Sequence, residues 1–192
     1  MYDTLKQICD LRKSARKFSN IKICDELIKK ILDVAYTSPF ASGRKSWKII
    51  TITDEHIISQ LSESVKNAII NFNDKIKNEY KDFFIKYSKN FIFFENCPVL
   101  LIPVFKNFPI LSYIMNNEDN SLEIFERDNY TKSIACVSTL ILLAAESLKL
   151  KACMMTGPLI AETEIKNILN INVNLNVGAI IPIGYEKELN NE

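Results

Sequence analysis

The run Thr131–Leu150, TKSIACVSTLILLAAESLKL, is the most continuously apolar stretch of this chain. Its apolar residues occupy most sides of a helix rather than one stripe, so we expect a helix that runs through the core. The uncharged part is too short, and too rich in Ser and Thr, to cross a membrane. Other helices and strands must therefore pack around this core helix.

Helical periodicity recurs on the N-terminal side of the core helix. Apolar residues at helical spacing predict a short helix over Tyr2–Leu11 and a second helix that starts at residue 24 or 25. Pro39 ends the second helix, because the residue before a proline avoids the α-helical region. Asp54 is placed to cap a third helix.

Three segments have the composition of strands. β-Branched and apolar residues dominate Trp47–Thr53, Val99–Phe105 and Val177–Tyr185. Pro103 lacks an amide donor, so we expect the second strand to lie at a sheet edge or to contain a bulge. A short helix is expected over Ala161–Leu169. Helices interleaved with strands predict an α+β fold, in which helices surround a central mixed β-sheet.

Two long segments are less regular. Residues 67–95 combine charges with an aromatic stripe at roughly helical spacing, which predicts one long or broken helix. Such a stripe serves the core, a subunit contact or a ligand site. Residues 106–129 form a long connection, and connections of this length are often lids or binding loops.

The composition excludes several classes of protein. A chain of 192 residues with 47% hydrophobic residues predicts one domain over residues 1–192. A net charge of +1 does not favour nucleic acid as a partner. Five scattered cysteines and a single histidine, His56, do not form a metal-binding pattern. Without a visible signal peptide, these thiols predict a reducing cytoplasm.

The stretch Arg12–Phe18, RKSARKF, is the strongest candidate for a binding site. It carries four cations and one hydroxyl, and such groups suit a phosphate or another anion with several oxygens. The alternative is a solvated basic turn. Only four glycines occur, and neither G-x-G-x-x-G nor a P-loop is present. Side chains must therefore hold any phosphate group.

The order of these motifs resembles the nitroreductase family of flavoproteins. The pieces that carry the resemblance are Arg12–Phe18, Ser38–Ala41 through Trp47, the end of the core helix at Leu143–Leu150, and Ile180–Tyr185. The resemblance implies a nitroreductase-like α+β fold, with FMN bound at a homodimer interface. It also implies a ping-pong reaction, in which hydride passes from NAD(P)H through flavin N5 to a nitro, quinone or other electron-poor acceptor.

The resemblance assigns roles to the cationic stretch. Arg12 and Ser14 match positions that hold the phosphate and ribityl end of FMN. Lys13 and Arg16 match positions near the N1–C2=O edge of the flavin, where a cation stabilises the negative charge of the reduced ring.

Later residues match further parts of the flavin site. Thr156 and Gly157 match the loop that passes flavin N5, where glycine allows close approach of the backbone. Many members carry a phosphate-binding Lys or Arg further along the chain than this sequence matches, and Lys187 is the residue that would substitute for it here. The resemblance supplies no dedicated general acid or base, so we expect no catalytic side chain of that kind.

One loop departs from the family pattern. Ser42, Gly43 and Lys45 lie in the loop that contacts the flavin in the family, but Gly43 and Lys45 stand where many members have Asn and Gln. Two alternatives to a general reductase therefore stay open. One is a flavin carrier or sensor without turnover, and the other is a specialised branch with one defined substrate, for which residues 106–129 would form the pocket.

Overall fold

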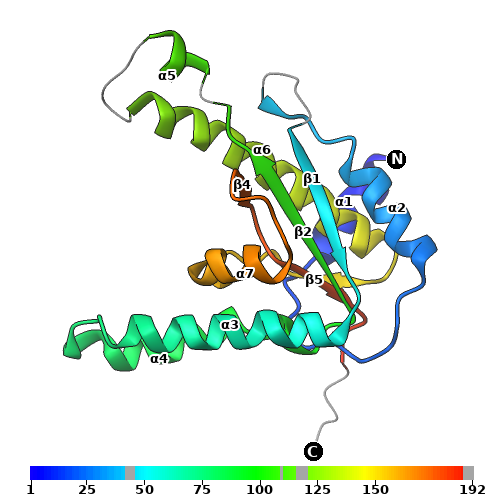
Figure 1. The fold of residues 1–192 in the computed structure, drawn as a ribbon. Coiled ribbons are helices and arrows are strands. Elements are labelled where there is room, and N and C mark those ends of the chain that lie inside the picture. The colour runs from blue at the N-terminus through cyan, green and yellow to red at the C-terminus, as the bar shows by residue number, and fades with distance from the viewer. Residues whose placement is uncertain (42–45, 109, 116–120, 188–192) are drawn as a thin grey trace, which may run out of the picture.

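The computed structural model describes residues 1–41, 46–108, 110–115 and 121–187 (Figure 1). The helices are α1 (Tyr2–Leu11), α2 (Asp25–Ala35), α3 (Glu55–Asn73), α4 (Lys81–Ser88), α5 (Ile110–Ile114), α6 (Ser121–Ser147) and α7 (Glu162–Ile168). The strands are β1 (Trp47–Ile52), β2 (Val99–Lys106), β3 (Lys151–Ala152), β4 (Leu175–Val177) and β5 (Ile181–Gly184). Short 3₁₀ turns occupy Asn78–Tyr80, Lys89–Phe91, Phe93–Asn96 and Gly157–Ala161.

Helices cover both faces of one central sheet (Figure 1). Helices α2 and α6 pack on one face, and α3 and α7 pack on the other. Successive side chains of β2 alternate between the two resulting cores, as side chains of a strand must. Val99, Leu101 and Phe105 enter the α2–α6 core, while Leu100, Ile102 and Val104 enter the α3–α7 core. This burial on both faces explains why the sequence of β2 is apolar throughout.

The sheet has the order β1-β2-β5-β3, and β4 also pairs with β2. Every pairing between these strands is antiparallel, with Trp47 opposite Phe105 and Lys151 opposite Gly184. The α+β class is confirmed. The expectation of a mixed sheet is not, because every pairing between the described strands is antiparallel and the parallel bridge between Ser14 and Ala152 joins β3 to a residue outside the strands.

Of the two expectations for Pro103, a sheet edge or a bulge, the sheet edge is wrong. Strand β2 is central, with β1 on one side and both β4 and β5 on the other. Strand β5 pairs with Val99–Leu101, whereas β4 pairs with Val104–Lys106. Pro103 therefore lies where the neighbouring strand is interrupted, and its carbonyl accepts a hydrogen bond from the Gly178 amide at 2.8 Å. The missing amide donor of Pro103 is tolerated because Pro103 faces the break between β4 and β5 on that side of β2, while β1 pairs with β2 on the other side.

The core helix is longer than expected. It begins at Ser121 rather than Thr131, so part of the predicted connection 106–129 is helical. Helix α6 has 27 residues and therefore spans about 40 Å. Ile134, Val137 and Ile141 are at most 1% exposed, which confirms that its central part is buried.

The remaining predictions agree with the structure in most places. Helix α1 and the start of α2 are confirmed, and Asp54 caps α3 by accepting hydrogen bonds from the amides of His56 (2.8 Å) and Ile57 (3.4 Å). Residues 67–95 form a broken helix. The predicted last strand is two strands, β4 and β5, and the short β3 was not anticipated. Within the described residues, no helix is long and apolar enough to cross a membrane.

Candidate functional site

The cationic stretch lies between two strands at one end of the sheet. On one side, the amide of Ala15 donates to the carbonyl of Ala152, the last residue of β3, at 3.2 Å. On the other side, the amide of Lys187, beyond β5, donates to the carbonyl of Lys17 at 3.3 Å. The stretch is therefore an irregular connection between α1 and α2 that two isolated bridges hold against the end of the sheet, and the second of them brings Lys187 beside the other cations.

Two apolar side chains anchor this segment. Ala15 and Phe18 are 5% and 4% exposed and belong to the α3–α7 core, whereas Arg16 and Lys17 between them are exposed. Gly184 leaves room for Phe18, because a Cβ at Gly184 would lie 3.0 Å from Cδ1 of that ring. The backbone of the stretch is thus fixed by the core, while its cations face outward.

Three predicted groups meet at the thiol of Cys153. Burial raises the pKa of this thiol, and a hydrogen bond from Ser14 and the positive charges of Arg16 and Arg12 oppose that rise. The hydroxyl and both guanidinium groups must lie close to Cys153 to act on its pKa in this way. The thiol is neutral at pH 7, so it is not an activated nucleophile.

The loop after β3 approaches a buried aromatic ring. A Cβ at Gly157 would lie 2.2 Å from Cδ1 of Phe91, so only glycine fits beside that ring as it stands. Phe91 is 9% exposed, and it packs edge-on against Tyr87 at 5.2 Å between ring centroids. Thr156 precedes this close contact and is exposed. The Gly157 backbone is therefore set by how Phe91 packs.

The structure brings most of the predicted site residues to this end of the sheet. Arg12, Lys13, Ser14 and Arg16 lie on the cationic segment, Lys187 lies beside it, and Thr156 and Gly157 follow Cys153 in the chain. Ser42, Gly43 and Lys45 lie outside the described residues.

The residues that flank this last loop lie at the opposite end of the sheet. The amide of Ala41 donates to the hydroxyl of Ser133 in α6 at 3.0 Å, and the Ser46 carbonyl accepts from the Lys106 amide at 2.8 Å. Lys106 is the last residue of β2, whereas Val99, the first, pairs with β5 near the cationic segment. Along α6, Ser133 is about 20 Å from the C-terminal end of the helix.

A cavity of about 530 Å³ lies beside the N-terminal part of α6. It is lined by apolar and aromatic side chains together with Glu126, which is 8% exposed. The Glu126 carboxylate accepts hydrogen bonds from the amides of Leu111 (3.0 Å) and Ser112 (3.3 Å) in α5. This carboxylate therefore fastens α5 over the cavity. The lining residues are Ala41, Ile110, Leu111, Phe125, Glu126, Asn129, Tyr130 and Ser133.

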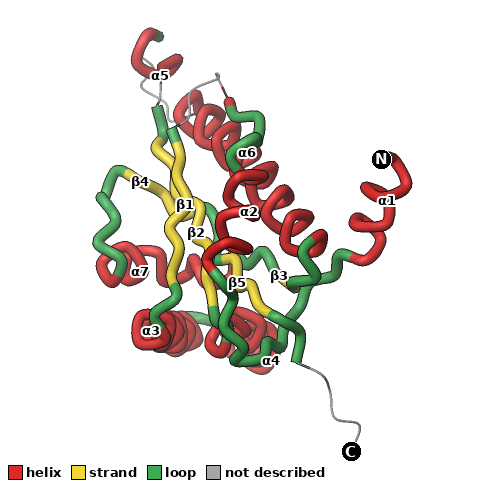
Figure 2. Tube along the Cα trace, turned by 90° about the vertical axis from the view of Figure 1, so that its right-hand side faces the viewer, coloured by secondary structure: helices red, strands yellow, loops and turns green. Residues whose placement is uncertain are grey.

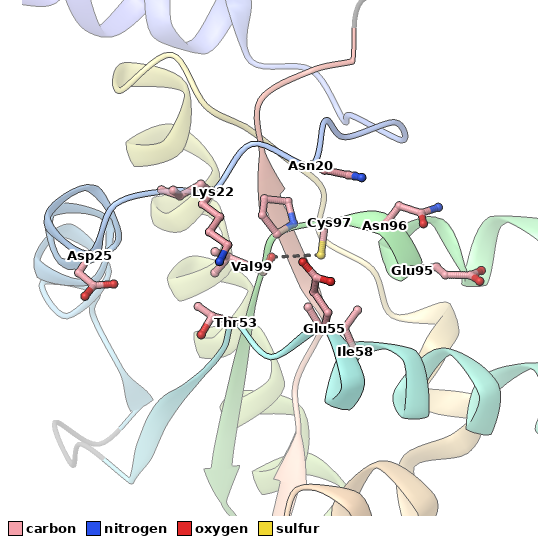
Figure 3. Close-up of a pocket in the computed structure, with 12 residues that line it drawn as sticks. Asn20, Lys22, Asp25, Thr53, Glu55, Ile58, Glu95, Asn96, Cys97 and Val99 are labelled. Carbon is pink, nitrogen blue, oxygen red and sulfur yellow. Dashed lines mark hydrogen bonds between the residues drawn. The ribbon is translucent and has the colours of Figure 1, made fainter.

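A second cavity, of about 340 Å³, contains none of the predicted residues (Figure 3). Lys22, Glu55 and Glu95 line it, and Cys97 lies at its base. Burial raises the pKa of the Cys97 thiol to about 12, and this thiol donates to the Val99 carbonyl at 3.2 Å. A thiol that stays protonated at neutral pH is not an activated nucleophile, and none of the predicted site residues lines this cavity.

Sequence reasoning did not identify Cys153 or Phe91 as part of the site. Cys153 stands three residues before Thr156, so its place next to a predicted loop was a usable signal. Phe91 belongs to the aromatic stripe, and nothing in the sequence distinguishes its ring from the exposed rings of Phe83 and Tyr87.

Comparison with known proteins identifies the family. The model of the nitroreductase family matches residues 11–185. The chain belongs to the nitroreductase family.

Several known proteins are similar to this chain. Iodotyrosine deiodinase of Hydra vulgaris is 24% identical over 177 residues, which cover 91% of this chain and 62% of the relative. A BluB-like flavoprotein from Clostridium difficile 630 has a TM-score of 0.85 at 21% identity, covering 98% of this chain and 92% of that one. An iodotyrosine deiodinase bound to FMN and 3-iodo-L-tyrosine has a TM-score of 0.71 at 19% identity, with the same coverage. The chain thus spans less than two thirds of the Hydra relative, and the two structural likenesses show the fold.

Proposed function

We propose that this chain is an FMN-dependent oxidoreductase that passes hydride from NAD(P)H to a nitro, quinone or other electron-poor acceptor. The observation that carries the proposal is that Arg12, Ser14 and Arg16 lie on one segment whose backbone is held by the Ser14–Ala152 bridge and by the buried side chains of Ala15 and Phe18. Guanidinium groups and a hydroxyl are donors that suit a phosphate. A family relative of known structure binds FMN. FMN supplies the electron transfer, and the protein binds it, orients it and tunes its potential.

The residues of the cationic segment would contact different parts of FMN. Arg12 and Ser14 would hold the phosphate and ribityl end, Arg16 and Lys13 would lie near the flavin ring, and Lys187 would add a further cation. Each charge-assisted hydrogen bond contributes about 1.5–3 kcal/mol.

Protons would come from water rather than from a dedicated side chain. The Cys153 thiol keeps its own proton at neutral pH because burial raises its pKa, so it is no general base. We therefore expect a pH profile of kcat/KM without one essential group from the site.

In a homodimer, one end of the sheet in one chain would lie beside the opposite end of the sheet in its partner. The flank of the 42–45 loop at Ser133 and the cationic segment are about 20 Å apart along α6, too far to contact the same edge of one flavin. Two chains with antiparallel α6 helices would bring one end of each together. Helix α1 supports this arrangement, because it projects from the molecule (Figure 2) and has no buried residue; Tyr2 and Leu5 are 74% and 56% exposed. Such apolar faces are typical of subunit contacts.

The first experiment is the visible absorption spectrum of the purified protein, followed by identification of the cofactor released on denaturation. The proposal requires a flavin spectrum with about one FMN per chain, and steady oxidation of NADH or NADPH with a quinone or nitroarene. Light scattering after size exclusion measures the subunit number. A colourless protein that takes up no added FMN would refute the flavoenzyme. Bound FMN that neither nicotinamide reduces would indicate a carrier or sensor instead.

A specialised aromatic substrate is the second candidate function. The cavity beside α6 is lined by Phe125 and Tyr130, and it falls in the region 106–129 where the sequence predicts a substrate pocket. Relatives of this chain are iodotyrosine deiodinases. Reductive dehalogenation takes two electrons and a proton, and it replaces the carbon–iodine bond with a carbon–hydrogen bond and releases iodide. Iodide release from 3-iodo-L-tyrosine by the chemically reduced protein, at a rate far above nitroarene reduction, would support this candidate.

The five cysteines are all free, which supports a reducing compartment such as the cytoplasm.

A further inference from the structure

One aromatic side chain contacts Arg16, one of the two cations that are predicted to lie near the flavin ring. The guanidinium carbon of Arg16 lies 5.7 Å from the centroid of the Phe93 ring. This distance is within the range of a cation–π interaction, and Arg is the cation that most often forms one. Arg16 is exposed and Phe93 is half-buried, so the ring is a fixed surface against which a mobile side chain rests.

The ring of Phe93 is held in place by its neighbours. Phe91 and Phe94, on either side of it in the chain, are 9% and 0% exposed and belong to the α3–α7 core. The core thus fixes the backbone of Phe93 from both directions. The same core contains Ala15, which fixes the backbone of Arg16. Both partners of the cation–π contact are therefore anchored at their backbones by one core.

The segment 91–93 reaches both halves of the candidate site. Phe91 fills the space beside Gly157, while Phe93 lies under Arg16. A solvated arginine samples many rotamers, and ordering it for a ligand costs entropy. An arginine that already rests on a ring loses less freedom when a ligand binds, because part of that ordering is present beforehand.

We propose that Phe93 is a positioning residue for the flavin site, which acts by holding the Arg16 guanidinium in place; this rests on the proposed function. A positive charge held near the flavin ring favours the form of FMN that carries more negative charge, and so it raises the midpoint potential. Phe93 sets that potential through Arg16 without touching the reacting atoms. It also favours FMN binding, because Arg16 is ordered beforehand.

The test compares Phe93→Leu with Phe93→Trp in the full-length protein loaded with FMN. Phe93→Leu keeps an apolar side chain but removes the ring face, whereas Trp offers the strongest ring for a cation. We expect Phe93→Leu to weaken FMN binding by about two- to fivefold and to make the two-electron potential about 10–20 mV more negative. Phe93→Trp should match or exceed the wild type in both measurements. Fluorescence titration gives the FMN dissociation constant, and dye-coupled reduction gives the potential.

Two controls separate positioning from packing. Ile141→Ala truncates a fully buried side chain of the α2–α6 core, away from this segment, so it should lower the melting temperature without moving the potential. In an Arg16→Ala background, Phe93→Leu should have no further effect on the potential, because its partner is already gone. A Phe93→Leu potential equal to wild type, while Arg16→Ala shifts it, would overturn the positioning role and leave the flavoenzyme intact. A wild-type protein that takes up no FMN would overturn both.

Discussion

The substitution Gly157→Ala tests whether the loop after β3 is held by close packing. The added methyl carbon would lie 2.2, 2.5 and 2.8 Å from Cδ1, Cε1 and Cγ of Phe91, whereas carbon atoms in contact are normally about 3.5–4.0 Å apart. The ring has little freedom to yield, because Phe91 is 9% exposed and packs against Tyr87. Overpacking of this kind costs about 1–3 kcal/mol.

An opposing effect of the same substitution is smaller. Replacing glycine by alanine reduces the entropy of the unfolded chain and stabilises a protein by about 0.4–1 kcal/mol where the backbone allows it. The backbone of Gly157 is outside the left-handed region, so this gain applies. Overpacking exceeds it, and we expect Gly157→Ala to lower the free energy of unfolding by about 1–2 kcal/mol. The loop should move away from Phe91 and weaken FMN binding.

Urea unfolding and FMN titration measure the two consequences. Gly178→Ala is the matched control, because its new methyl carbon would lie 2.4 Å from Cγ2 of Ile134, in the other core. This control should lose stability but bind FMN normally. Adding Phe91→Leu to Gly157→Ala should restore most of the lost stability, since it removes the ring that the new methyl group would overlap. Wild-type stability in Gly157→Ala, or no rescue by Phe91→Leu, would refute the packing argument.

Three further predictions concern charge and ionisation. Arg12→Ala and Arg16→Ala should each weaken FMN binding by about ten- to hundredfold, measured by fluorescence titration, because each removes a charge-assisted contact; a loss of less than twofold in both would place the phosphate elsewhere. Burial raises the pKa of the Cys97 thiol to about 12 from 9.0, so the folded state should lose stability as the pH rises above 9. The free energy of unfolding should fall by about 1.4 kcal/mol per pH unit, because only the unfolded state then loses the proton. Cys97→Ala should flatten that part of the urea-derived stability profile, and an unchanged slope would contradict the burial. Alkylation of Cys153, followed by mass spectrometry, should slow when FMN is bound; equal rates with and without FMN would show that the cofactor does not cover this thiol.

The sequence was sufficient to predict a helix or strand where the pattern that encodes it is local. The periodicity of α2 and the carboxylate of Asp54 act within a few residues, so each predicts its element without knowledge of the rest of the chain. The apolar run of β2 likewise identifies a buried strand. The central helix was recognised from its apolar residues but not its true start, because Ser121–Tyr130 mixes charged residues with apolar ones such as Ile124 and Phe125 that are exposed, and so it lacks the apolar character of the rest of the helix.

Features that depend on distant partners were not predictable in this way. Pro103 looked like an edge residue, yet it lies in a central strand because β4 and β5 leave a gap opposite it. Strand β3 has two residues and exists only because β5 and the cationic segment pair with it. No local pattern encodes either fact.

The candidate site likewise combines a local pattern, which the sequence shows, with packing against distant residues, which it does not show. The residue types of Arg12, Ser14 and Arg16 indicate an anion, but a solvated turn of the same composition would bind one poorly. The decisive feature is the burial of Ala15 and Phe18, which turns the segment into part of the fold. Ligand affinity and stability are consequently coupled: a substitution that loosens Phe18 would disperse the cations even though it removes none of them. Phe18→Ala should therefore lose FMN affinity as well as about 3–5 kcal/mol of stability, whereas Lys17→Ala, at an exposed position of the same segment, should leave the stability near wild type.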